Sequence, residues 1–160
     1  MRMAAAGLTI SIGTDGAGSN NSQDMIESLK FAALLQKVAA RDASVVCAQT
    51  ILDWATRGAA KTLGLAGDIG SLEAGKKADL FVLAANSAKI VPAHDPVTWL
   101  VYSAGEGDVT MTIADGKVLM RDGVLLNVDE REVLTRCQTA AQQLADRCGS
   151  NARVTRTWRL

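Results

Sequence analysis

The segment that most restricts the fold is Leu8–Gly13, which has the sequence LTISIG. It is short, apolar and β-branched, carries no charge and ends at a glycine. This pattern is typical of a buried strand in a parallel sheet. Such a strand needs a neighbour on each side, and parallel neighbours are joined by long crossovers. The chain offers no neighbour close in sequence, so we expect it to correspond to a piece of a larger fold.

Composition excludes several classes of partner. The 160 residues include 48% apolar side chains, which suits one domain with a real core. Seventeen basic and seventeen acidic residues cancel, which argues against a nucleic-acid partner. No apolar run approaches the ~20 residues that span a bilayer, so we expect no membrane partner. An odd set of cysteines without metal-type spacing predicts reduced core thiols and a cytoplasmic location: Cys47, Cys137 and Cys148.

The first half of the chain predicts a loop followed by helices. Residues 14–24 are turn formers without periodicity, and either Ser22 or Asp24 can cap the helix that follows. A second helical stretch runs over residues 48–63, where Gly58 weakens it or splits it in two.

The second half predicts short strands and two further helices. Asp115-Gly116 lies between two alternating apolar runs, a strong hairpin signal because both residues tolerate positive φ. The expected elements are a strand at 80–83, a helix at 97–103, strands at 109–114, 118–120 and 124–126, and a closing helix from Asp129. The fold class is therefore α+β or irregular α/β, with about four helices on a small mixed or antiparallel sheet.

Asp15 is the main candidate site residue. It follows the expected strand directly, and ligands bind at the carboxyl ends of strands in parallel α/β folds. The same residues also fit an ordinary turn, in which Asp15 is a turn residue and Ser19, Asn20 and Asn21 cap and bend the chain. A small-molecule binding module built on residues 14–21 is a further alternative.

Other polar residues favour structural roles. His94, the only histidine, lies beside prolines and is expected at the surface or at a helix start, so the chain holds no multi-histidine metal site. The charged group of Glu73, Lys76, Lys77 and Asp79 predicts a solvated turn in which Asp79 orients the following strand.

Three segments taken together resemble the amidohydrolase superfamily, in particular its aminohydrolase branch. That branch includes S-adenosylhomocysteine and methylthioadenosine deaminases, guanine deaminases and triazine hydrolases. The similar segments are ISIGTDGAGSNNSQDM, ATRGAAKTLGLAGDIGSLEAGKKADLFVL and DPVTWLVYSAGEGDVTMTIADGKVLMRDG, within a match from Leu8 to Arg147.

The resemblance implies a division of the chain. Residues 1–64 would be the carboxyl-terminal end of a TIM-type barrel, including its last strand. Residues 65–128 would be part of a small β-sandwich, 129–148 a closing helix and 149–160 a flexible tail.

The resemblance also implies a site with most of its parts missing. Asp15 stands where the family has a metal ligand that accepts a proton from the attacking water, and Ser19 and Asn20 would contact substrate. Zinc or iron is the family's metal, held largely by histidines that this chain lacks, and a glutamate acid/base is also absent. We therefore expect no cofactor on the isolated chain, and metal at Asp15 only if other ligands are supplied in trans.

Two functions stay open at this point. The chain is either the carboxyl-terminal portion of a metal-dependent hydrolase of C–N bonds in a purine-like or triazine-like ring, inactive alone, or a non-catalytic oligomerising module. Exposed strand edges and apolar helix faces favour a homo-oligomer, with exchanged elements, or a complementing amino-terminal barrel chain as partner.

Overall fold

The computed structural model describes residues 1–92 and 94–149. The chain forms two compact units, Met1–Val124 and Leu125–Leu160. The expected flexible tail falls almost entirely on residues 150–160, which lie outside the described residues.

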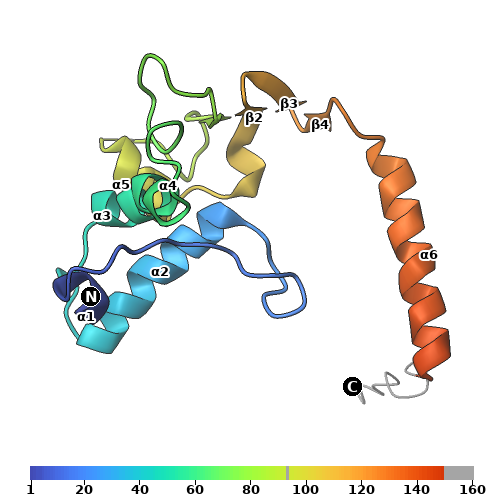
Figure 1. The fold of residues 1–160 in the computed structure, drawn as a ribbon, viewed down its shortest axis with the longest axis horizontal. Helices are drawn as coiled ribbons and strands as arrows, with labels where there is room; N and C mark the ends of the chain where they lie inside the picture. Colours follow the sequence, from blue (N-terminus) through green and yellow to red (C-terminus); the bar gives the residue numbers. More distant parts are fainter. Residues whose placement is uncertain (93, 150–160) are drawn as a thin grey trace. The chain divides into compact units, whose positions relative to one another are not determined.

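Helices dominate the first unit (Figure 1). Asp24 rather than Ser22 caps the long helix α2, since its Oδ1 accepts a hydrogen bond of 2.7 Å from the N–H of Ile26. The second expected helix forms as one run with a π-helical turn that ends at Gly58. The helical elements are α1 (Arg2–Ala5), α2 (Met25–Ala40), α3 (Ala48–Asp53), the π-turn η1 (Trp54–Gly58), α4 (Ala59–Thr62), α5 (Pro96–Tyr102) and the 3-10 turn η2 (Glu106–Asp108).

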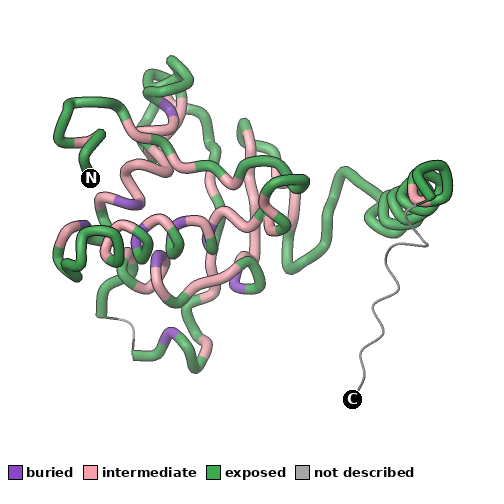
Figure 2. Tube along the Cα trace, turned by 90° about the horizontal axis from the view of Figure 1, so that it is seen from below, coloured by how far each residue is buried: buried purple, intermediate pink, exposed green. Residues whose placement is uncertain are grey.

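The buried core is built by α2, α3 and α5, which pack against one another (Figures 1 and 2). Its buried members are all apolar, and Ile51 and Val101 are the largest side chains that are fully buried. Burying an aliphatic side chain of this size contributes about 1.5–3 kcal/mol. The cluster consists of Leu29, Ala33, Val46, Ala48, Ile51 and Val101.

The sheet has four strands in sequential order: β1 (Leu80–Leu83), β2 (Val109–Ala114), β3 (Lys117–Arg121) and β4 (Val124–Leu125). The pairs β1–β2 and β2–β3 are antiparallel, with a register irregularity in each. This arrangement confirms the α+β class and the antiparallel form of the expected sheet.

The β2–β3 hairpin turns at Asp115-Gly116, as expected. Both residues have positive φ, 49° and 76°, the conformation that suits a two-residue hairpin turn. Asp79 fixes this turn to the start of β1, because its Oδ1 accepts a hydrogen bond of 2.6 Å from the N–H of Asp115. Lys77 adds an ion pair of 3.4 Å with Asp115.

The second unit contains the long helix α6 (Glu130–Cys148). Asp129 caps it by accepting a hydrogen bond from the N–H of Glu132 at 3.0 Å, which confirms its expected start. In the chain's described part, no helix is both long and apolar enough to cross a membrane.

Two expectations are wrong: the strand at residues 8–13 and the burial of the three cysteines. Residues 8–13 do not form a strand but run extended without a paired neighbour. A strand needs a ladder of hydrogen bonds to a second strand, and the segment has none. The three cysteines are free and exposed rather than buried. Cys47 precedes α3, and Cys137 and Cys148 lie on α6, which has no buried residue.

Candidate functional site

The Asp15 loop follows the extended segment and presents a carboxylate to solvent. Asp15 has φ of 60°, in the left-handed region that aspartate tolerates better than most residues. Its Oδ1 accepts a hydrogen bond of 2.7 Å from the N–H of Gly16. The residue is exposed, so the rest of the carboxylate can be approached from outside.

Electrostatics keep Asp15 ionised. The N–H of Gly16, followed by the hydroxyl of Ser19, holds the pKa of this carboxyl below its usual value. An ionised carboxylate is the form that ligates a cation or accepts a proton.

The three residues expected at the site do lie in one loop. Ser19 Oγ donates to the carbonyl oxygen of Gly16 at 3.0 Å, and Asn20 Nδ2 donates to the carbonyl oxygen of Thr14 at 2.8 Å. Both side chains therefore brace the turn around Asp15. Ser19 is exposed, whereas Asn20 is half-buried.

These residues do not fit a complete metal site. Among residues 1–92 and 94–149, no group of three or more His, Cys, Asp or Glu side chains could hold a metal ion. Zinc and iron sites need three or four protein ligands, of which Asp15 can supply one.

His94 and the charged turn take the structural roles expected of them. His94 is exposed in the loop before α5, next to Asp95, which caps that helix. Lys76 Nζ donates to Ser71 Oγ at 2.7 Å and pairs with Glu73 at 3.7 Å, which closes the turn on itself.

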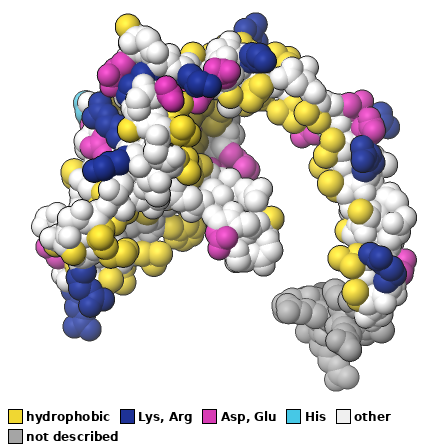
Figure 3. All heavy atoms as spheres, viewed as in Figure 1, with side chains coloured by type: hydrophobic (Ala, Val, Ile, Leu, Met, Phe, Trp, Pro, Cys, Tyr) yellow, Lys and Arg dark blue, Asp and Glu magenta, His cyan; other side chains and the backbone are white. Residues whose placement is uncertain are grey.

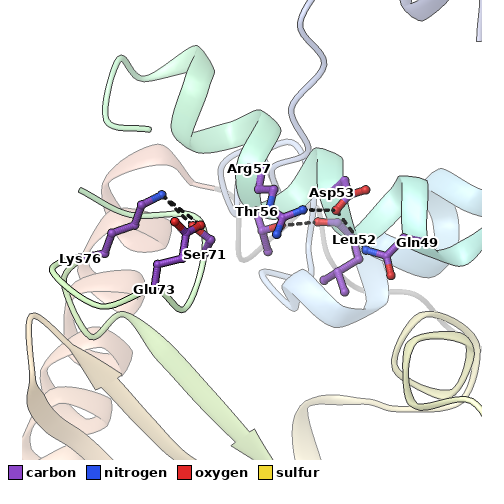
Figure 4. A network of polar contacts seen from close by, with 8 residues as sticks. All are labelled: Gln49, Leu52, Asp53, Thr56, Arg57, Ser71, Glu73 and Lys76. Carbon is purple, nitrogen blue, oxygen red and sulfur yellow. Dashed lines mark hydrogen bonds and ion pairs between the residues drawn. The ribbon is translucent and has the colours of Figure 1, made fainter. Parts of the chain in front are cut away.

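A groove of about 640 Å³ lies between the α3–α4 run and β1, and sequence reasoning did not find it. One wall carries Asp53, which accepts a hydrogen bond from Gln49 at 3.0 Å and pairs with Arg57 at 3.8 Å (Figure 4). Glu73 and Phe81 also line the groove. In the sequence, this groove is signalled only by the i, i+4 spacing of Gln49, Asp53 and Arg57, which places the three side chains on one helix face.

Two tertiary polar contacts were also missed. Lys89 Nζ lies 2.6 Å from Asp108 Oδ2, and Asp108 is the one buried charged residue among those described. Asp24 Oδ2 accepts a hydrogen bond of 3.3 Å from the N–H of Glu106, 82 residues away. No local pattern signals either contact, because the partners meet only in the folded chain.

Known proteins match this chain in sequence over most of its length. The 5-methylthioadenosine/S-adenosylhomocysteine deaminase of Desulforudis audaxviator is 47% identical over 146 residues, which cover 91% of this chain and 34% of that protein. The 5'-deoxyadenosine deaminase of Methanosarcina mazei is 40% identical over 149 residues, 93% of this chain and 34% of that protein.

Solved structures share the backbone. A zinc-bound adenosine deaminase from Xanthomonas campestris superimposes with a TM-score of 0.87 at 33% identity, over 90% of this chain and 33% of that one. A zinc complex of atrazine chlorohydrolase from Arthrobacter aurescens gives 0.78 at 28% identity, over 85% of this chain and 30% of that one.

The chain thus spans about a third of the length of the curated relatives that it matches. The sequence model of the Amidohydrolase family matches residues 1–119, well over half of the chain. The family-model match, the deaminases similar in sequence and the solved structures similar in backbone agree. The chain belongs to the amidohydrolase family.

Proposed function

We propose that this chain forms part of a deaminase that hydrolyses the bond between the adenine ring and its amino group in an adenosine-type nucleoside. The observation that carries the proposal is the likeness to deaminases over about nine tenths of the chain, at 47% identity in sequence and a TM-score of 0.87 in backbone. A purine substrate is preferred to a triazine because the first sequence relatives are named for adenosine derivatives.

The reaction is a hydrolytic substitution on the ring. Water adds to the ring carbon that bears the amino group, the C–N bond breaks, and ammonia leaves while the oxygen stays on the carbon. Asp15 has the properties of the group that accepts the proton of that water: it is exposed, and its carboxyl is ionised at neutral pH, as that of an ordinary aspartate is. Ser19 and Asn20 would hold the loop in this geometry and contact substrate at its rim.

The remainder of the site must come from outside residues 1–92 and 94–149, because those residues lack a complete ligand set. We therefore propose that the chain alone does not turn over substrate, and that Asp15 acts only beside groups supplied by further polypeptide. The exposed thiols of Cys47, Cys137 and Cys148 support the cytoplasm, a reducing compartment, as its location.

A covalent chimera tests the proposal. Residues 1–160 would replace the third of the Desulforudis audaxviator deaminase that they match, and release of ammonia from S-adenosylhomocysteine would be measured with zinc present. Turnover by the chimera supports the proposal. A chimera that folds, as judged by its melting transition, but releases no ammonia from S-adenosylhomocysteine, methylthioadenosine or 5'-deoxyadenosine contradicts it.

A non-catalytic oligomerising module is the second candidate function. It is favoured by a stripe on α2 in which apolar side chains at i, i+3, i+4 and i+7 are exposed: Phe31, Leu34, Leu35 and Val38. Hydrophobic side chains do reach the surface over this region of the first unit (Figure 3). An inactive chimera together with a stable oligomer of the free chain would favour this alternative.

A further inference from the structure

The 3-10 turn η2 is held in place by a buried carboxylate at its end. Asp108 is 7% exposed, and its Oδ2 lies 2.6 Å from Lys89 Nζ. The same oxygen accepts a hydrogen bond from the N–H of Gly105 at 2.9 Å, and the carbonyl oxygen of Asp108 accepts one from the N–H of Ala84 at 2.8 Å. A buried carboxylate is stable only with such partners, so they hold the turn in one conformation.

The start of η2 reaches the end of the Asp15 loop. The N–H of Glu106 donates to Asp24 Oδ2 at 3.3 Å, while Asp24 Oδ1 accepts from the N–H of Ile26 in α2. The N–H of Asp24 donates in turn to Ser22 Oγ at 3.2 Å. Asp24 therefore joins the turn η2 and the helix α2 to the loop, and η2 also lies against α2.

A short connection leads from Asp24 back to the carboxylate of the site. Only residues 21–23 separate Asp24 from Asn20. Asn20 Nδ2 donates at 2.8 Å to the carbonyl oxygen of Thr14, the residue before Asp15. The turn around Asp15 is closed by this hydrogen bond, so a shift of Asp24 is passed on to the turn.

The beginning of the loop is fixed separately. The carbonyl oxygen of Ile10 lies against Gly58, where a Cβ would stand only 2.2 Å away, and Ile12 packs against the helical core cluster. With its start held by the helices, the loop depends on Asp24 for the position of its other end.

We propose that Asp108 is a positioning residue for Asp15, acting through η2 and the N–H that Glu106 offers to Asp24. Asp108 does not touch the reacting atoms; it fixes the turn that fixes the loop. The inference rests on the proposed function, in which Asp15 accepts a proton and must lie within hydrogen-bond reach of the attacking water. A misplacement of about 1 Å in such a group can cost about 10²-fold in rate.

A pair of variants at Glu106 tests the joint without touching the buried ion pair. Glu106→Pro removes the N–H that donates to Asp24. Proline fits there because Glu106 is the first residue of the turn and Gly105 before it is extended, with φ of −152° and ψ of 176°. Glu106→Ala removes the same exposed side chain but keeps the N–H, so it is the matched control.

Hydrogen exchange on residues 1–160 gives a readout that needs no reaction. The amides of Gly16 and Asn20 are hydrogen-bonded within the turn around Asp15. We expect both to exchange at least about fivefold faster in Glu106→Pro and in Asp108→Asn, because the loop opens more often. Glu106→Ala should match the unaltered chain.

A control for stability is Ile51→Val, which removes a buried methyl group from the core cluster. That cluster includes none of Asp24, Glu106 and Asp108. The variant lowers stability through lost packing, and it should leave exchange in the Asp15 loop unchanged.

The kinetics of the chimera give the second readout. In Glu106→Pro and Asp108→Asn, kcat for ammonia release from S-adenosylhomocysteine should fall at least about tenfold while KM changes less than about twofold, since the proton acceptor is displaced and substrate is still bound. Glu106→Ala and Ile51→Val should keep the unaltered kcat. Lys89→Met should reproduce the loss, whereas Lys89→Arg, which keeps a cation for Asp108, should restore most of it.

Each result decides the inference. Unchanged exchange in both Glu106→Pro and Asp108→Asn overturns it, as does faster exchange with an unaltered kcat or an equal loss of kcat in Glu106→Ala. If Asp108→Asn no longer folds, Glu106→Pro decides. Faster exchange in both variants together with a chimera that is inactive even when unaltered upholds the hold of η2 on the loop and counts against the proposed function. An active chimera without any change in loop exchange does the opposite.

Discussion

Gly58 and Ile10 are in direct backbone contact: a Cβ on Gly58 would stand 2.2 Å from the carbonyl oxygen of Ile10 and 3.2 Å from that of Asp53. This contact explains a glycine inside a helical run, where alanine is normally the better residue by about 1 kcal/mol. It also ties the extended segment to the helices, so the backbone that carries Asp15 depends on it.

Gly58→Ala is expected to destabilise the chain by about 2–3 kcal/mol, because the added Cβ clashes with the carbonyl oxygen of Ile10, and the clash is relieved only if the extended segment moves away from the helix. Urea unfolding followed by circular dichroism measures the change. Gly67→Ala is the control, since a Cβ there meets no atom within 4 Å, and its stability should change by less than about 0.5 kcal/mol. Equal effects at the two positions would refute the contact.

Asp24 both caps α2 and binds the backbone of Glu106, so its replacement should cost more than a cap alone. Asp24→Ala is expected to lose about 1–2 kcal/mol of unfolding free energy. Asp24→Ser retains a capping oxygen but is too short to hold both donors, and should lose less. The same urea titration compares them, and a serine variant as unstable as the alanine variant would count against the dual role.

Asp108 should make stability depend on pH. The hydrogen bond from Lys89 is the main cause that lowers the pKa of this carboxyl, against the opposing effect of its burial. A folded pKa below the unfolded value, about 3.9, stabilises the fold above that value, and the gain is lost as the pH falls through the folded pKa. Asp108→Asn should therefore be less stable than the unaltered chain at pH 6, by about 1–2 kcal/mol.

The difference between these two proteins should shrink as the pH falls below about 4. Asp122→Asn, in an exposed turn, is the control and should match the unaltered chain at each pH. A constant difference for Asp108→Asn across the titration would rule out the ion pair as its origin.

The apolar stripe on α2 should drive self-association of the isolated chain. Leu35 and Val38 are 60% and 74% exposed, so charges there should cost little stability. We expect light scattering to give a mass above that of one chain, and the double variant Leu35→Lys, Val38→Glu to shift it toward one chain. Leu72→Lys, at a residue 75% exposed outside the stripe, should leave the mass unchanged. A monomeric unaltered chain with a cooperative melt would contradict this expectation.

Local signals allowed much of the fold to be predicted. The strand at Val109–Ala114, the turn at Asp115-Gly116 and the cap at Asp129 are correct, because each depends on residues within a few positions of one another. The Asp15 loop was located in the same way, from turn formers after an apolar run.

Features that depend on distant partners could not be predicted. Residues 8–13 have a strand sequence but no paired strand, since local preference cannot supply the neighbour. Cys137 lies on an apolar helix face, yet a face is buried only where another element packs against it. The pair Lys89–Asp108 joins a loop to the 3-10 turn η2, and no periodicity in the sequence signals that they meet.

The most direct test of the account is the rate of ammonia release from S-adenosylhomocysteine by the chimera, with and without Asp15. Asp15→Asn should lower this rate by about 10³-fold, since a neutral amide cannot accept a proton. Asp42→Asn is the matched control: Asp42 is also exposed, and hydrogen bonds from Ser44 likewise lower its pKa. Full activity in Asp42→Asn with a large loss in Asp15→Asn is the predicted result, and equal rates in both variants would contradict the role assigned to Asp15.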